Sequence, residues 1–174
     1  MAAHVLFVCS GNIARSAFAE RYAALRAQQL ARPGIVFSSA GFDAVEGYAM
    51  EPRMAAELVA RGASPAGFRA RQVEPKLMSG VDLVLTMTVR QRHLLATRFV
   101  FTADLVHPLG HAVRLLPQVA PATVTSLGHQ LTALAPGYDR RDDVPDPMHA
   151  GPQAARAVAD RICELVDALL DGLT

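Results

Sequence analysis

"HVLFVCSGNIARSAFAE", residues 4 to 20, joins an apolar run to a short turn and then to a helix-like pattern. The run from Val5 to Val8 is typical of a β-strand that is buried on both faces. Cys9 follows directly, small and polar residues span 10 to 14, and the apolar spacing beyond Arg15 is that of a helix. A buried strand, a turn and a helix in this order predict the first unit of a parallel α/β sheet.

The rest of the chain repeats this alternation. Further strands are expected at 34–41, 81–88 and 98–102, and helices at 15–30, 51–62, 89–96 and 153–171, with two imperfect helices within 103–135. A long Pro- and Asp-rich loop, 135–152, precedes the last helix, and long loops in compact domains are often functional. The pattern predicts a single three-layer α/β domain over 1–174. It has a four-stranded parallel sheet, helices on both faces and an anion-binding loop after the first strand.

Composition narrows the class of protein. The chain has 174 residues, 51% of them hydrophobic, which suits one domain with a substantial core. A net charge of +1 without runs of like charge disfavours a nucleic-acid or anionic-membrane partner. No stretch predicts a membrane span or a signal peptide, and two cysteines are too few for a disulfide framework. We therefore expect a cytoplasmic protein without a cofactor, and a monomer is favoured.

The turn after the first strand has the composition of an anion-binding loop. Backbone N–H groups of such a turn converge in front of a helix N-terminus, whose dipole favours negative charge. Gly11 and Asn12 tolerate positive φ, and the planar fork of Arg15 suits two oxygens of a phosphate-like anion. Helix N-termini and cations lower the pKa of a cysteine thiol from about 8.5 to roughly 3.5–7.5. A thiol at this position therefore predicts a nucleophile, whereas a lone cysteine elsewhere is more often a small buried hydrophobe.

"VCSGNIARS", residues 8 to 16, resembles the phosphate loop of the low-molecular-weight protein tyrosine phosphatases, V-C-x-G-N-[IT]-C-R-S. "VPDPMHAG" resembles the late Asp-Pro motif of that family, and "SSAG" (38–41) and "RARQV" (69–73) match weaker segments. The resemblance covers the whole chain. It implies a metal-independent phosphatase acting on a phosphorylated protein or a small aryl phosphate through a cysteinyl-phosphate.

The resemblance also implies a role for each matching residue. Cys9 is the expected nucleophile, Arg15 the phosphate clamp and Asp146 the acid that protonates the leaving oxygen. Ser39 is expected to support the loop. The phosphate-binding loop comprises Ser10, Gly11, Asn12, Ile13, Ala14, Arg15 and Ser16, of which Asn12 and Ser16 are also expected to hold its shape.

The chain departs from the family pattern in several places. Ala14 replaces the second loop cysteine, so a protective disulfide within the loop is impossible and Cys9 should be easily over-oxidised. Met148 stands where many members have a tyrosine that walls the slot for a phenyl ring, which weakens the expectation of phosphotyrosine preference. Ile13 argues against phosphoarginine, for which specific members carry threonine. The interval of about 103–140 is expected to be an inserted helical region.

Other assignments stay open at this point. Asp142 and Asp143 compete with Asp146 but do not precede a proline, and they are expected to cap or solvate the loop. Cys163 fits the apolar stripe of the last helix. His107 and His111 lack the further ligands of a zinc site, so no metal is predicted. The alternative functions are an arsenate reductase that uses an external low-molecular-weight thiol and a non-catalytic phosphate- or phosphoprotein-binding module.

Overall fold

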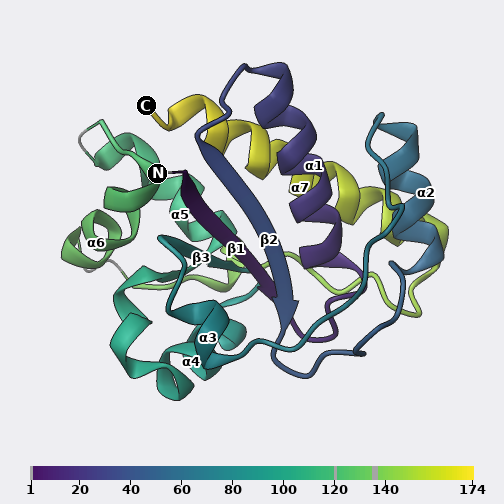
Figure 1. Ribbon diagram of the computed structural model, residues 1–174, viewed down its shortest axis with the longest axis horizontal. Helices are drawn as coiled ribbons and strands as arrows, with labels where there is room; N and C mark the ends of the chain where they lie inside the picture. The colour runs from purple at the N-terminus through teal and green to yellow at the C-terminus, as the bar shows by residue number, and fades with distance from the viewer. Residues whose placement is uncertain (1, 120, 135–136) are drawn as a thin grey trace.

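A computed structural model describes residues 2–119, 121–134 and 137–174. Four parallel strands form one sheet in the order β2-β1-β3-β4, and their carboxyl ends point to the same edge (Figure 1). The strands are β1 (Ala3–Cys9), β2 (Ile35–Gly41), β3 (Leu83–Thr86) and β4 (Val106–Pro108). The sheet confirms the predicted α/β architecture, with the anion-binding loop after β1.

Helices connect the strands and cover the sheet. The α-helices are α1 (Arg15–Gln29), α2 (Pro52–Ala60), α3 (Pro75–Met78), α4 (Val89–Arg98), α5 (Leu109–Leu115), α6 (Val124–Leu134) and α7 (Gly151–Gly172). Three short 3-10 segments, η1 (Val100–Leu105), η2 (Leu116–Gln118) and η3 (Arg140–Asp142), complete the elements. The interval 103–140, expected to be inserted, contains β4, α5 and α6. None of the helices within the described ranges is long and apolar enough to cross a membrane.

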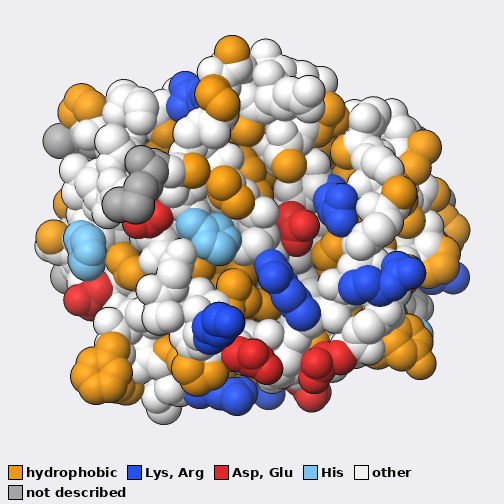
Figure 2. Space-filling view, in the orientation of Figure 1, with side chains coloured by type: hydrophobic (Ala, Val, Ile, Leu, Met, Phe, Trp, Pro, Cys, Tyr) orange, Lys and Arg blue, Asp and Glu red, His pale blue; other side chains and the backbone are white. Residues whose placement is uncertain are grey.

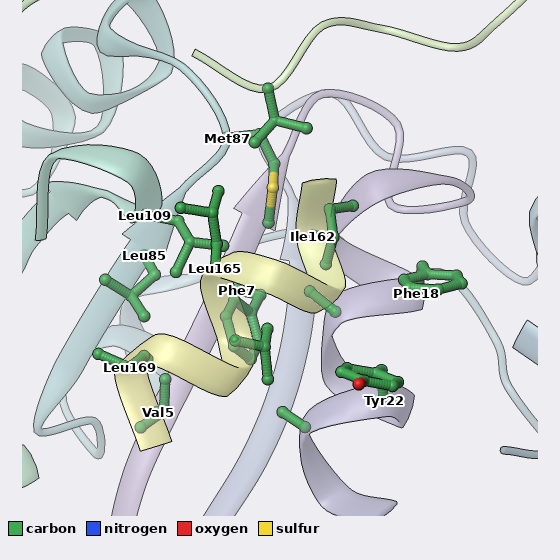
Figure 3. Packing of buried hydrophobic residues seen from close by; sticks show 14 of the residues in the cluster. Val5, Phe7, Phe18, Tyr22, Leu85, Met87, Leu109, Ile162, Leu165 and Leu169 are labelled. Atoms are coloured by element: carbon green, nitrogen blue, oxygen red, sulfur yellow. The ribbon is translucent and has the colours of Figure 1, made fainter. Parts of the chain in front are cut away.

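Alternate residues of β1 point into two separate cores. Val5 and Phe7 pack with α1 and α7 in the larger core, where Ile162, Leu165 and Leu169 face the sheet (Figure 3). Leu6 and Val8 point to the opposite face and pack with residues of the α3 and α4 region. A strand that is apolar on both faces is expected in a sheet with helices on both sides. The continuous apolar sequence of β1 therefore accounts for the three-layer arrangement of helices, sheet and helices.

The predicted strand over 98–102 is wrong. Arg98 ends α4, and the next residues form η1, where Val100 is 62% and Phe101 is 102% exposed. The fourth strand is instead the three-residue β4, which pairs with β3. The apolar run 99–101 resembles a strand, but it lies outside the sheet, and of its side chains only Phe99 is partly buried, against the smaller core.

Charges are distributed over the surface. Both acidic and basic side chains lie on the face shown in Figure 2, among hydrophobic side chains. The charged residues of the candidate site lie at the carboxyl ends of the strands, where the phosphate loop and the 137–150 loop meet.

Candidate active site

The loop between β1 and α1 turns its carbonyl groups outward. Four of its carbonyl oxygens accept hydrogen bonds from the segment 42–51. The bonds run from Phe42 N to Cys9 O (3.2 Å), Asp43 N to Ser10 O (3.1 Å), Val45 N to Gly11 O (3.0 Å) and Glu51 N to Ile13 O (2.7 Å). None of the backbone N–H groups from Ser10 to Arg15 has an acceptor among the described residues. These amides are therefore available to an anion bound in the loop.

Asn12 fixes the shape of this loop. Its φ of 55° lies in the left-handed region, which asparagine adopts more readily than most residues. Its side-chain amide donates to Ser16 Oγ (2.9 Å) and Ser39 Oγ (2.8 Å), and its Oδ1 accepts from Arg71 N (2.9 Å). All three contacts are buried or partly buried, so the loop is held from α1, β2 and the 69–73 segment at once.

Cys9 lies at the floor of the loop, only 2% exposed. Its Sγ is 3.0 Å from Ser16 Oγ. Because Ser16 Oγ already accepts a hydrogen bond from Asn12, its own proton can point to the sulfur or to the carbonyl oxygen of Ala40, which is 3.5 Å away. On the far side, Ser39 Oγ donates to Glu20 Oε2 (2.6 Å) and accepts from Asn12. This network orders the hydroxyl groups around the Cys9 sulfur, and Glu20 is a member that the sequence analysis missed.

Arg15 brings the late Asp-Pro motif to the loop. Its guanidinium donates to Asp146 Oδ2 (2.7 Å) and to the carbonyl oxygen of Val144 (3.1 Å). The Arg15 side chain is 6% exposed, whereas that of Asp146 is 49% exposed. Asp146 Oδ1 accepts from Met148 N (3.1 Å). The structure thus brings Cys9, Arg15 and Asp146 together around one loop.

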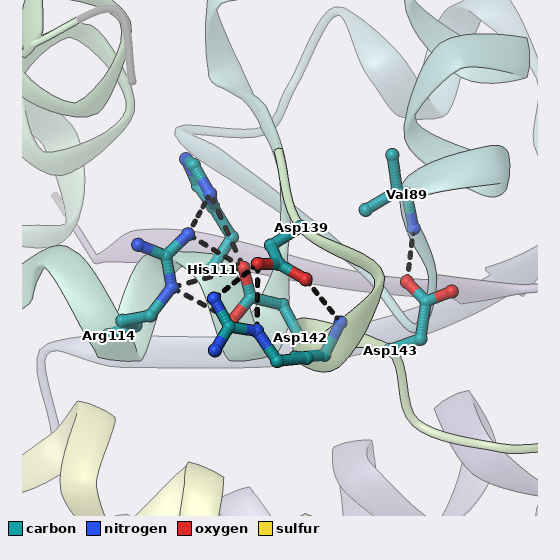
Figure 4. A network of polar contacts seen from close by, with 7 residues as sticks. Val89, His111, Arg114, Asp139, Asp142 and Asp143 are labelled. Carbon is teal, nitrogen blue, oxygen red and sulfur yellow. Dashed lines mark hydrogen bonds and ion pairs between the residues drawn. The ribbon is translucent and has the colours of Figure 1, made fainter. Parts of the chain in front are cut away.

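Asp142 and Asp143 point away from Arg15. Asp143 accepts from Val89 N (2.7 Å) and so caps the start of α4. Asp142 is 5% exposed and forms a two-point ion pair with Arg114 (Figure 4). The expectation that both residues cap or solvate the loop is therefore wrong for Asp142, which is buried against α5.

Three apolar side chains lie in or beside the loop. Ile13 and Met148 are partly buried against the larger core. Val45, 37% exposed, lies over Gly11, where an added Cβ would be 3.5 Å from Val45 Cγ2. The amide of Gln91 supplies the polar exception, because its Nε2 donates to Ser10 Oγ (3.3 Å). The sequence contains no signal that connects Gln91 or Val45 to the loop, since both contacts depend on tertiary packing.

Cys163, His107 and His111 lie outside this arrangement. Burial raises the pKa of the Cys163 thiol to about 11. Burial, with a smaller contribution from His107, lowers the pKa of His111 to about 4. The two imidazole rings stack with centroids 6.0 Å apart. Over the described part of the chain, no three His, Cys, Asp or Glu side chains are grouped as metal ligands.

Comparison with known proteins agrees with this geometry. The sequence model described as "Low molecular weight phosphotyrosine protein phosphatase" matches residues 4–118. The probable low molecular weight protein-tyrosine-phosphatase EpsP of Ralstonia nicotianae is 35% identical over 106 residues, which are 61% of this chain and 70% of that protein.

Solved structures share the fold over nearly the whole chain. The low molecular weight protein tyrosine phosphatase of T. tengcongensis has a TM-score of 0.80 at 24% identity, covering 99% of this chain and 100% of that one. The YwlE arginine phosphatase of Geobacillus stearothermophilus has a TM-score of 0.74 at 24% identity, covering 97% and 91%. With its phosphate loop and late Asp-Pro motif in place, this chain belongs to the low molecular weight phosphotyrosine protein phosphatase family.

Proposed function

We propose that this chain hydrolyses phosphotyrosine-type phosphomonoesters through a phosphate ester on Cys9. The observation that carries the proposal is the single loop at which a buried thiol, Arg15, Asp146 and amides without an acceptor among the described residues come together. Phosphoryl transfer requires stabilisation of charge on the equatorial oxygens, a nucleophile in line and a proton for the leaving oxygen. The loop amides and Arg15 would stabilise the charge, Cys9 would be the nucleophile, and Asp146 would supply the proton.

In the first step, the phosphate binds to the amides of 10–15 and to the guanidinium of Arg15. Asp146 occupies that guanidinium in the structure, so the phosphate competes with its carboxylate for Arg15. A carboxyl group that loses a cation and gains an anionic neighbour is favoured in its protonated form. The Cys9 sulfur then attacks phosphorus, the bond to the leaving oxygen breaks, and Asp146 gives that oxygen its proton.

In the second step, water attacks the phosphorus of the cysteinyl-phosphate. Asp146, now ionised, accepts a proton from this water, and the sulfur leaves with the electron pair of the S–P bond. Ser16, whose Oγ is 3.0 Å from Cys9 Sγ, is placed to donate to the departing thiolate. Inorganic phosphate leaves, and Asp146 can return to Arg15.

The apolar side chains beside the loop favour a substrate with an aryl group, but they do not identify one particular substrate. Ile13, Val45 and Met148 offer apolar surface beside the loop, which suits the ring of a phosphotyrosine. The fold does not decide the substrate, because a protein named as an arginine phosphatase shares it. The substrate is therefore proposed to be a phosphorylated protein or a small aryl phosphate, with the chain acting as a cytoplasmic monomer without a cofactor.

The first test is release of phosphate from p-nitrophenyl phosphate in the presence of a chelator. We expect Cys9→Ser to abolish turnover and Asp146→Ala to lower kcat about 100-fold or more. Parallel assays with phosphotyrosine, phosphoserine and phosphoarginine peptides measure the preference, which is expected to be for phosphotyrosine. A folded protein that binds phosphate or arsenate but hydrolyses no ester would contradict the proposal. It would lead instead to assays of thiol-dependent arsenate reduction and then to a binding role.

A further inference from the structure

The segment 139–146, which carries the acid, is attached to the body of the protein at successive residues. Asp142 contacts α5, Asp143 caps α4, and Val144 N donates to Met87 O (2.8 Å) just beyond β3. Val144 O then accepts from Arg15. Each contact goes to a different element, so the path of this segment, and with it the position of Asp146, is determined by contacts outside the segment.

The attachment at Asp142 is the most strongly bonded of these. Arg114 Nε lies 3.0 Å from Asp142 Oδ1, and Arg114 Nη2 lies 2.8 Å from Oδ2. The Asp142 side chain is only 6% exposed, so this carboxylate depends on its partner for compensation of its charge. His111 Nδ1 is 3.7 Å from Oδ2, but burial lowers the pKa of His111 to about 4, and a neutral imidazole does not supply that charge near pH 7. Arg114 is therefore the cation that holds Asp142 (Figure 4).

A second contact between α5 and Asp142 involves the backbone of Asp142. Gly110, one helical turn before Arg114 on α5, lies so close to Asp142 that a Cβ would clash with the Asp142 carbonyl oxygen. The backbone of Asp142 thus rests directly on α5 while its carboxylate is held by Arg114. Two independent features of one helix, a missing side chain and a charged one, fix the same point of the segment.

We infer that Arg114 and Asp142 are positioning residues for the catalytic acid, and that Gly110 lets the backbone of Asp142 pack directly against α5. The inference rests on the proposed function, in which Asp146 protonates the leaving oxygen. Asp142 lies four residues before Asp146, so loss of its contact with α5 leaves the position of the acid to the bonds of Val144 with Met87 and Arg15. General acid catalysis is sensitive to such displacement, since misplacement by about 1 Å can cost up to roughly 100-fold in rate.

The test compares two esters with different leaving groups. Phenolate, with a conjugate-acid pKa of about 10, needs protonation far more than p-nitrophenolate does. For Arg114→Ala we expect kcat/KM to fall about tenfold more with phenyl phosphate than with p-nitrophenyl phosphate, with the inhibition constant of inorganic phosphate within about twofold of wild type. Gly110→Ala, which leaves the ion pair chemically intact, should show the same imbalance. A loss of folded protein alone would lower both rates by one factor.

Arg141→Ala is the matched control. It removes an arginine from the same segment, but the Arg141 side chain is 90% exposed and, among the described residues, its ion pair is with the nearby Asp139, so both rates should stay within about twofold of wild type. Arg114→Lys should restore part of the phenyl phosphate rate, because it keeps the charge without the two-point fork. Should Arg114→Ala fail to fold, Asp142→Asn, which preserves the shape of the side chain, takes its place in the comparison.

Asp146→Ala separates this inference from the proposed function. If Asp146→Ala shows the imbalance between the two esters and the folded Arg114 and Gly110 variants do not, the positioning role is overturned while the acid assignment stands. If Asp146→Ala shows no imbalance, or the wild type hydrolyses neither ester, the proposed function itself fails.

Discussion

The two cysteines show how the surroundings of a single residue decide its chemistry. Cys9 is the last residue of β1, beside Ser16 and next to amides that have no acceptor within the described chain. Cys163 lies on α7, where burial raises the pKa of its thiol to about 11. At pH 7.5 a thiol of that pKa is ionised in a fraction on the order of 10⁻⁴ to 10⁻³, and only the thiolate is a good nucleophile.

We therefore expect iodoacetate to attach one carboxymethyl group per folded chain at pH 7.5, on Cys9. The carboxylate of iodoacetate is an anion that can bind in the phosphate loop. Inorganic phosphate should therefore compete for the loop and slow the reaction. Mass spectrometry of the peptides measures the site, and Cys163→Ser should leave the rate of labelling unchanged. Unfolding in urea should expose Cys163 and raise the stoichiometry to two. Equal labelling of both cysteines in the folded protein would show that Cys163 is not protected by its surroundings.

At this scale the sequence predicts contacts between near neighbours better than contacts across the fold. Cys9, Asn12, Arg15 and Ser16 lie within one strand-turn-helix unit, where the local geometry determines their mutual positions. Glu20 and Gln91 could not be predicted, because Glu20 is linked to the loop through Ser39 of β2 and Gln91 contacts Ser10 from α4, and both contacts depend on how these elements pack. Asp146 was predictable only through the family resemblance, since nothing local connects it with Arg15.

At the scale of elements, the end of β2 is pressed against the phosphate loop. A Cβ at Gly41 would clash with the carbonyl oxygen of Ser10, and would lie 3.0 Å from Asn12 N and 3.1 Å from Ala44 Cα. All three are backbone atoms, which cannot move aside as a flexible side chain can. The close approach of β2 to the loop therefore requires glycine at this position.

Gly41→Ala should lower the free energy of unfolding by about 2 kcal/mol and reduce kcat/KM for p-nitrophenyl phosphate, because the loop must shift to make room. Urea unfolding and steady-state kinetics measure the two effects. Gly34→Ala is the control at the other end of β2, where a Cβ would have no heavy atom within 4 Å, so stability and activity should be nearly unchanged. Equal behaviour of the two variants would contradict the packing argument.

The elements that the sequence analysis predicted well are those with long, periodic patterns. The strand at the start of the chain and the helices 15–29 and 151–172 lie close to their predicted bounds. β4 was missed because it has only three residues, Val106, His107 and Pro108, and its burial comes from pairing with β3. The apolar run at 99–101 has the composition of a strand, but hydrophobic content alone does not show whether a segment reaches the sheet.

At the scale of the whole molecule, the same α5 region that holds the acid segment also couples stability to pH. His107 and His111 are each 1% exposed, and burial lowers both pKa values. Their surroundings include the cations Arg92 and Arg114, which disfavour a further positive charge, and Asp142, which favours it. For His111 burial and the cations prevail, so the folded state holds this imidazole neutral.

The pKa of His111 falls from 6.5 to about 4 on folding, so the unfolded chain binds more protons between these two values. Stability from this residue is therefore complete above pH 6.5 and is lost as the pH falls toward 4, by about 2 kcal/mol between pH 7 and pH 5. Urea unfolding at both pH values should show this decrease in the wild type, and His111→Gln should reduce it, with the remainder due in part to His107. His129→Gln, at an exposed histidine of α6, should leave the difference unchanged. A His111→Gln protein with the full wild-type decrease would show that other groups carry the pH dependence, whereas a reduced decrease would identify the buried His111 imidazole as a group through which acid lowers the stability of the fold.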